Sequence, residues 1–253
     1  SGSTVGSLAG PLLSLLLPAA TTVQLTVAAA MMCVVALIVQ QNEQLAEATA
    51  RSHASLLVPS WIEVRQLLHS PFLRRFAVFT FSMTACVTIQ SLIVRQVFQS
   101  LTVTESREAF ASMDFATNIF TLLIQWFFLD RIISWLGLRR ALLLTPAMSI
   151  LLLVVMGASP PIIVLSACQV ARRAMHFAVG RVSREMLWVD VDPHEKRRAK
   201  AFMDVFVYRA GDVVAAALWE VAERALSDQF VRAGTLLGVP SGVAWLYAAD
   251  SVA

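Results

Sequence analysis

Long apolar segments alternate with shorter polar segments along the whole chain. Most approach the 20 or so residues that a helix needs to cross a bilayer, and the first is shorter. Strict alternation of apolar and polar residues, which is typical of half-buried strands, is absent. Because helices satisfy their own backbone hydrogen bonds in lipid, the pattern predicts an all-α membrane protein. The eight predicted spans are 1–17, 22–40, 72–99, 110–130, 140–157, 161–180, 200–221 and 232–249.

Hydrophobic residues make up 57% of the 253 residues, and charged residues only 15%. Soluble domains carry about 25% charged residues, so this composition excludes a soluble globular enzyme, a disordered chain and a nucleic-acid-binding module. Three cysteines are too few for a disulfide scaffold, and the four histidines show no metal-ligand spacing. Phosphate-binding glycine loops and the Gly-x-Ser-x-Gly motif are absent. We therefore expect no enzyme activity, no cofactor and no metal site.

Basic residues concentrate in alternate connections between the predicted spans. Segments 41–71, 131–140 and 181–200 are rich in them, whereas the intervening connections carry one basic residue or none. Because basic loops stay on the cytoplasmic side, these segments are predicted to face the cytoplasm of a bacterial inner membrane. Topology and lipid account for this charge, so membrane lipid is an expected partner and nucleic acid is not. Trp245 and Tyr247, near the end of the last span, are predicted to lie at the lipid–water interface.

The polar segment 41–71 divides the chain into two unequal parts. Two predicted spans lie before it, within 1–40, and six lie after it, within 72–253. This arrangement matches a major facilitator-type transporter, in which two six-helix halves enclose a substrate cavity. Residues 1–40 would be the last two helices of the first half, and the chain, which begins at Ser1, is expected to be truncated at its N-terminus. Residues 61–68 are spaced as in an amphipathic surface helix, with a partly ordered linker as the alternative.

The connection after the fourth predicted span carries an acidic–basic motif. Asp130 and Arg131 are followed by Gly137, Arg139 and Arg140. This order resembles the Gly-x-x-x-Asp-Arg-x-Gly-Arg-Arg loop of the major facilitator superfamily, although the leading glycine is missing and extra residues separate Asp-Arg from Gly. The resemblance implies a cytoplasmic charge clasp between neighbouring helix ends, and therefore a gate rather than a substrate site.

A sharper likeness covers residues 172–212, where three short motifs follow one another. They are Arg184-Glu185, then Glu195-Lys196-Arg197-Arg198-Ala199-Lys200, then Asp204 with Tyr208-Arg209 and Gly211-Asp212. The block resembles the bacterial, facilitator-like branch of the ATP:ADP antiporter family, and a looser likeness extends back to about residue 72. The resemblance implies nucleotide exchange, and we add Arg184 and Glu185 to the expected gate.

The same block departs from that family in two places. Residues 88–92 correspond to a span that carries an acidic residue in the family's nucleotide exchangers, yet they contain no carboxylate. The exchangers also carry a lysine where Arg209, Gly211 and Asp212 stand here, and Asp212 would repel a phosphate. The resemblance therefore supports the fold and the lineage more strongly than ATP:ADP exchange.

Charged residues inside the predicted spans are the main functional candidates, because such groups are costly in lipid and face partners or a water-filled cavity. One interpretation is a network of arginines and aspartates that clamps the spans at 161–180 and 200–221 together. A second assigns arginines to an anionic substrate, since a guanidinium offers phosphate two parallel hydrogen bonds. Arg95 and Arg209 are the first substrate candidates, followed by Gln90, Arg172 and Arg173.

A third interpretation is proton coupling at Asp204 or His176. Asp212 and Tyr208 complete this candidate coupling or charge network, since Tyr208 follows Asp204 by one helical turn and Asp212 by two. Arg172 and His176 are also one turn apart and should share a face.

These features together predict a secondary transporter that works by alternating access and exchanges a nucleotide, an organic phosphate or another small anion. The alternatives are a proton-coupled exporter of an unrelated solute and a membrane-embedded interaction module without transport.

Overall fold

The computed structural model describes residues 70–252, except 159–160, 190, 192 and 226–229. The predicted spans at 1–17 and 22–40, and nearly all of segment 41–71, lie outside the described residues. Within the described part every regular element is a helix, and the predicted all-helical structure is confirmed there.

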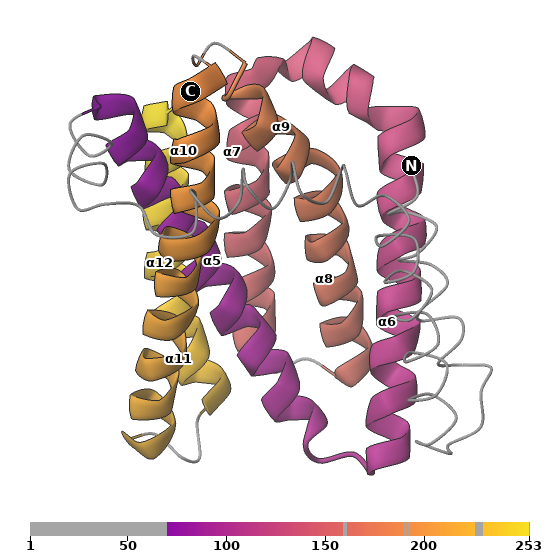
Figure 1. Ribbon diagram of the computed structural model, residues 1–253. Coiled ribbons are helices and arrows are strands. Elements are labelled where there is room, and N and C mark those ends of the chain that lie inside the picture. Colours follow the sequence, from indigo (N-terminus) through magenta and orange to yellow (C-terminus); the bar gives the residue numbers. More distant parts are fainter. Residues whose placement is uncertain (1–69, 159–160, 190, 192, 226–229, 253) are drawn as a thin grey trace, which may run out of the picture.

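The described helices follow one another with short connections (Figure 1). Three of them contain a π-helical turn, in which the backbone hydrogen bonds span one residue more than in an α-helix. In chain order the elements are α5 Pro71–Phe98, α6 Val103–Leu123, η1 Ile124–Phe128, α7 Leu129–Gly157, α8 Ile162–Met175, η2 His176–Gly180, α9 Arg181–Met186, α10 Pro193–Phe202, η3 Met203–Val207, α11 Tyr208–Ala225 and α12 Phe230–Val252.

Local sequence signals explain where the first helices begin. Pro71 occupies the start of α5, where its missing N–H costs no hydrogen bond. Thr102 and Glu105 form a capping box at the start of α6, because each side chain bonds the backbone N–H of the other. The bounds of α5 therefore agree closely with the predicted span 72–99, whereas α6 begins at Val103, well before the predicted start at residue 110.

Long helices that follow one another in the chain mostly run in opposite directions, so their ends gather at two ends of the bundle (Figure 1). The end of α5, the start of α6, the end of α7 and the start of α8 lie at one end. The start of α5, the bend within α7, the end of α9 and the start of α10 lie at the other, together with the end of α12. The basic segments 131–140 and 181–200 are therefore at the same end of the bundle, which we call the basic end.

The structure corrects the prediction that 131–140 is a simple loop. The chain stays helical from η1 into α7, and only Gly137 leaves the helical conformation, with φ 72° and ψ 165°. Glycine adopts positive φ without a Cβ clash, so the bend falls at this residue. Most of 181–200 is likewise helical, within α9 and α10.

Three apolar clusters hold the described helices together. The largest joins α5, α7, α11 and α12 and includes Ile89, Leu153 and Trp219. The second joins the end of α5 to α6, α7 and α8, and includes Phe98 and Met156. The smallest joins α7 to η2 through Ala141, Ala178 and Val179. α12 packs against α5 and α7, α11 packs against α5, and α6 packs against α8.

Three described helical segments are long and apolar enough to cross a membrane, by length and composition: Pro71–Phe98, Val103–Gly157 and Ile162–Met186. The middle one has 55 residues and bends at Gly137. The count of eight spans stays a prediction.

Several large apolar side chains stand on the outer surface. Trp126 is 82% exposed and Tyr247 78% exposed. The interfacial position predicted for Trp245 is wrong, because its indole is buried and packs edge-on against the rings of Phe79 and His176.

Candidate functional site

A cavity of about 630 Å³ opens between α5, α6, α8 and the start of α11. Twelve residues line it: Val87, Ser91, Val94, Arg95, Phe110, Asp114, Gln169, Arg172, Arg173, His176, Phe177 and Tyr208. Five of these, namely Arg95, Arg172, Arg173, His176 and Tyr208, belong to the candidate set from the sequence.

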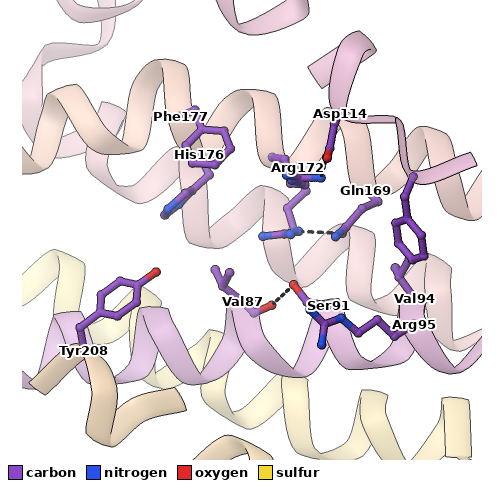
Figure 2. Close-up of a pocket in the computed structure, with 12 residues that line it drawn as sticks. Val87, Ser91, Val94, Arg95, Asp114, Gln169, Arg172, His176, Phe177 and Tyr208 are labelled. Carbon is purple, nitrogen blue, oxygen red and sulfur yellow. Dashed lines mark hydrogen bonds and ion pairs between the residues drawn. The ribbon is translucent and has the colours of Figure 1, made fainter. Parts of the chain in front are cut away.

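The two ends of the cavity differ in chemistry (Figure 2). Tyr208 and His176 lie toward one end with Val87, whereas Arg95 and Gln169 lie toward the other. The cavity therefore has an aromatic end and a cationic end.

Arg172 is the most deeply placed charge of the cavity. Arg172 is only 2% exposed. Its Nε donates a hydrogen bond to Oε1 of Gln169, at 3.1 Å (Figure 2). No ion pair joins Arg172 to a carboxylate in the part of the chain that the structure describes. A buried cation without a paired anion is costly, and here its remaining donors border an open cavity.

Arg173, the next residue on α8, is paired differently. Its Nη1 donates to Oδ1 of Asp114 on α6, and both side chains are partly exposed. This arginine–aspartate pair joins α8 to α6 across the cavity wall. The predicted clamp between α8 and α11 is not found among the described residues.

Arg95 supplies the third guanidinium, from the last turn of α5. It is exposed and lines the cavity one turn beyond Ser91, whose hydroxyl donates to the carbonyl of Val87 at 2.9 Å. The cavity therefore carries three arginines and one carboxylate, and that carboxylate is already engaged by Arg173. The balance favours an anionic ligand.

His176 and Tyr208 face the cavity from η2 and the start of α11. Nδ1 of His176 is buried and has no hydrogen-bond partner among the described residues. The predicted common face of Arg172 and His176 is confirmed, since both residues line the cavity. His176 and Tyr208 therefore add an imidazole and a phenol to the cavity wall.

The structure does not bring four other candidates into the cavity. Arg209 has a side chain that is 77% exposed and lies 3.8 Å from Asp212 of its own helix. Asp212 accepts a hydrogen bond from the hydroxyl of Thr88, at 2.6 Å, and so links α11 to α5. Asp204 is exposed on η3. Gln90 is fully buried and donates to the Ser149 carbonyl on α7, at 2.9 Å.

Two of the six predicted gate residues, Arg139 and Glu185, form ion pairs at the basic end. Arg139 bonds Asp250 of α12 through Nε and Nη2, at 2.9 and 2.7 Å. Glu185 of α9 accepts from Lys200 of α10 at 2.6 Å. Both pairs join helix ends, which is the arrangement that the acidic–basic motifs imply.

The other gate candidates have no such contact. Asp130, Arg131 and Arg140 are exposed on the helical bend, and Arg184 is half-buried on α9.

Some functional side chains were missed in the sequence, above all Asp114, Gln169 and Phe177. Asp114 could have been found, because a carboxylate inside an apolar span is rare for the same reason as the arginines. Gln169 and Phe177 carry no such signal. In the described part of the chain, no three His, Cys, Asp or Glu side chains come together as a metal site would require.

Comparison of the chain with family models, with curated proteins and with solved structures finds no match. The assignment of function therefore depends on the residues and their geometry.

Proposed function

We propose that this protein is a multi-pass secondary transporter of the major facilitator type, whose cavity binds a small organic anion. The helices at 71–98, 103–157 and 162–186 support a membrane location. The resemblance to the ATP:ADP antiporter family supports the lineage, and makes nucleotides and organic phosphates the first solutes to test.

One observation carries the proposal. Arg172 is buried, points its guanidinium at an open cavity and has no carboxylate partner among the described residues. A protein that needed only packing at this position would be better served by an apolar side chain, because a lone buried charge destabilises the fold. An anion bound between Arg172 and Arg95 would supply the missing negative charge through charge-assisted hydrogen bonds.

Alternating access gives this geometry a mechanism. The basic end carries the ion pairs Arg139–Asp250 and Glu185–Lys200, and we place it in the cytoplasm of a bacterial inner membrane because basic segments stay inside. In this mechanism the solute binds the cationic end of the cavity, and the helix bundles rock about it while contacts at the helix ends break and re-form.

A proton-coupled exporter is the second candidate, and one observation favours it. His176 lines the cavity, and its buried Nδ1 has no hydrogen-bond partner in the described part of the chain, so a proton could bind there without breaking a hydrogen bond that the structure shows. In this case the solute need not be anionic, and transport would depend on the proton gradient.

Exchange in proteoliposomes tests both candidates. The full chain is reconstituted with unlabelled AMP, ATP, inorganic phosphate or a dicarboxylate inside, and uptake of the same labelled anion is followed. We expect counter-exchange of at least one of these anions, insensitive to an uncoupler. Uptake that collapses with an uncoupler, and that needs no internal anion, would favour the proton-coupled exporter instead.

Two arginine variants sharpen the test. Arg95→Ala removes a cavity guanidinium and should lower uptake about tenfold or more, since a hydrogen bond to a charged group contributes roughly 1.5–3 kcal/mol. Arg209→Ala removes another exposed arginine, one outside the cavity, and should leave uptake within about twofold. An interaction module without transport would show no exchange in any of the three proteins.

A further inference from the structure

A second hollow lies on the outer surface, where α5 meets the junction between α10 and α11. Its volume is about 370 Å³, and every lining side chain is apolar. One wall is Ala77, Val78 and Phe81 of α5, and the other includes Phe202, Phe206 and Ala210. We call this hollow the apolar groove.

The groove is open, although its walls are made of groups that avoid water. Val78 is 51% exposed and Phe206 45% exposed. Phe202 and Phe206 stack with their ring centroids 5.5 Å apart, and the π-helical turn η3 brings the adjacent Val207 to the same wall. A rigid apolar slot of this kind fits a chain of methylene groups better than a polar solute.

Both walls of the groove descend from the basic end of the bundle. Two hydrogen bonds join α5 to α11, Thr88 to Asp212 and Gln96 to Glu223, and the residue numbers rise in the same direction along both helices. The helices are therefore parallel, and α10 leads into α11 from the same end at which α5 begins (Figure 1). A residue one helical turn before either wall therefore lies at the rim of the groove that faces the basic end.

An arginine occupies that position in the α5 wall. Arg74 precedes Ala77 and Val78 by one turn of α5. Arg74 is exposed and forms no ion pair with any described residue. Long basic side chains at a helix end extend toward the membrane surface, where they attract anionic headgroups.

The nearby charges leave this rim basic. Lys200 is engaged by Glu185. Asp204 is two residues from both Phe202 and Phe206, which places it on the opposite side of that helix from the groove.

We propose that the apolar groove is a binding site for an anionic phospholipid. One acyl chain fills the slot between α5 and η3, and the headgroup phosphate sits at the rim that carries Arg74. The site rests on the membrane location proposed above, but not on the identity of the transported solute. It is separate from the cavity, since the two share no lining residue.

Lipid binding to the purified full chain tests the site without any transport assay. The protein is held in detergent micelles, and phosphatidylglycerol or phosphatidylcholine with the same acyl chains is titrated in. Bound lipid is counted by native mass spectrometry. We expect phosphatidylglycerol to bind at least fivefold more tightly than phosphatidylcholine. Arg74→Gln should weaken the binding of phosphatidylglycerol about fivefold, because one basic side chain at a membrane surface contributes roughly 1 kcal/mol.

A filling variant and a matched control separate the groove from general surface charge. Ala210→Phe places a ring in the slot and should abolish tight binding of both lipids, while circular dichroism confirms retained helix content. Arg131→Gln removes an exposed arginine of the same basic end, away from the groove, and should leave binding unchanged. Equal affinity for the two lipids, an equal loss in Arg131→Gln, or undiminished binding in Ala210→Phe overturns the proposal. Failure of the transport assay alone does not bear on it.

Discussion

The two sides of α5 meet the rest of the bundle in different ways. Toward α11 and α12 the contact is closed by glycines. A Cβ added at Gly234 would lie 2.6 Å from Cγ1 of Ile93, and one at Gly211 would lie 2.9 Å from the carbonyl oxygen of Phe81. Toward α6 and α8 the same helix presents Val87, Ser91 and Arg95 to the open cavity.

The two sides of this single helix therefore have different roles, close packing on one side and a cavity wall on the other. The closed side gains dispersion contacts by bringing backbones together, which leaves no room for a side chain. The open side holds charged groups around an unfilled space, which lowers the stability of the fold. Such a loss of stability is typical of a functional site that binds a ligand. Substitutions on the closed side should therefore act on folding, and those on the open side on binding.

The largest effect should come from filling the closed side. Gly211→Val would press its side chain against the backbone of α5, which cannot move as a flexible side chain can. We expect unfolding to become easier by about 3 kcal/mol, as for severe overpacking. Thermal unfolding in detergent measures this. The control is Ala217→Val, which adds bulk to an exposed position of α11 and should shift stability by less than about 1 kcal/mol. Equal losses in the two variants would contradict a closed contact at Gly211.

The next largest effect should come from the open side, at Arg172. Arg172→Met keeps the length of the side chain and removes a buried cation without a carboxylate partner. We expect anion uptake to fall about 10- to 100-fold, since hydrogen bonds to charged groups contribute roughly 1.5–3 kcal/mol. Thermal stability should be unchanged or higher, because the charge no longer has to be buried. A variant that loses both uptake and stability would show that Arg172 has a structural role instead.

A smaller effect is expected at the ion pair between Asp114 and Arg173. Asp114→Asn leaves Arg173 free to face the cavity, so affinity for a small anion should rise several-fold at low salt and less at high salt. Stability should fall by less than about 1 kcal/mol, because both side chains are partly exposed. Isothermal titration at two salt concentrations measures the affinity, and Arg173→Gln serves as the comparison, for which affinity should fall. Equal affinities in Asp114→Asn and the unmodified protein would mean that the pair is independent of the cavity.

The sequence predicted the helices well because their signals are local. Pro71 and Thr102 mark helix starts, and Gly137 marks the bend, so these elements follow from single residues and their neighbours. The helical spacing of Arg172 and His176 likewise predicted their common face. Such features depend only on the geometry of one helix.

The sequence was less informative wherever the partner of a side chain lies on another helix. Arg173 and Arg209 both stand in predicted spans, yet one lines the cavity beside Asp114 and the other is exposed. Trp245 has the amphipathic side chain of an interfacial residue, but tertiary packing buries it. The π-helical turns η2 and η3 also have no sequence signal, although they set which residues face the cavity and the apolar groove.

The smallest effect is expected at the basic end, where the side chains are exposed to solvent and belong to neither the closed nor the open side of α5. Arg139 bonds one carboxylate oxygen of Asp250 through two nitrogens, but the side chains are 64% and 48% exposed. Water and salt screen such a pair, so Arg139→Gln should lower stability by only about 0.5 kcal/mol or less. If the pair is a gate, the same variant should still change the rate of exchange, because a contact that breaks in each cycle contributes to the barrier rather than to the resting fold. Uptake rates for Arg139→Gln and for Arg140→Gln, an exposed neighbour outside the pair, would show this. Equal rates in the two variants would reduce Arg139–Asp250 to a surface contact between α7 and α12.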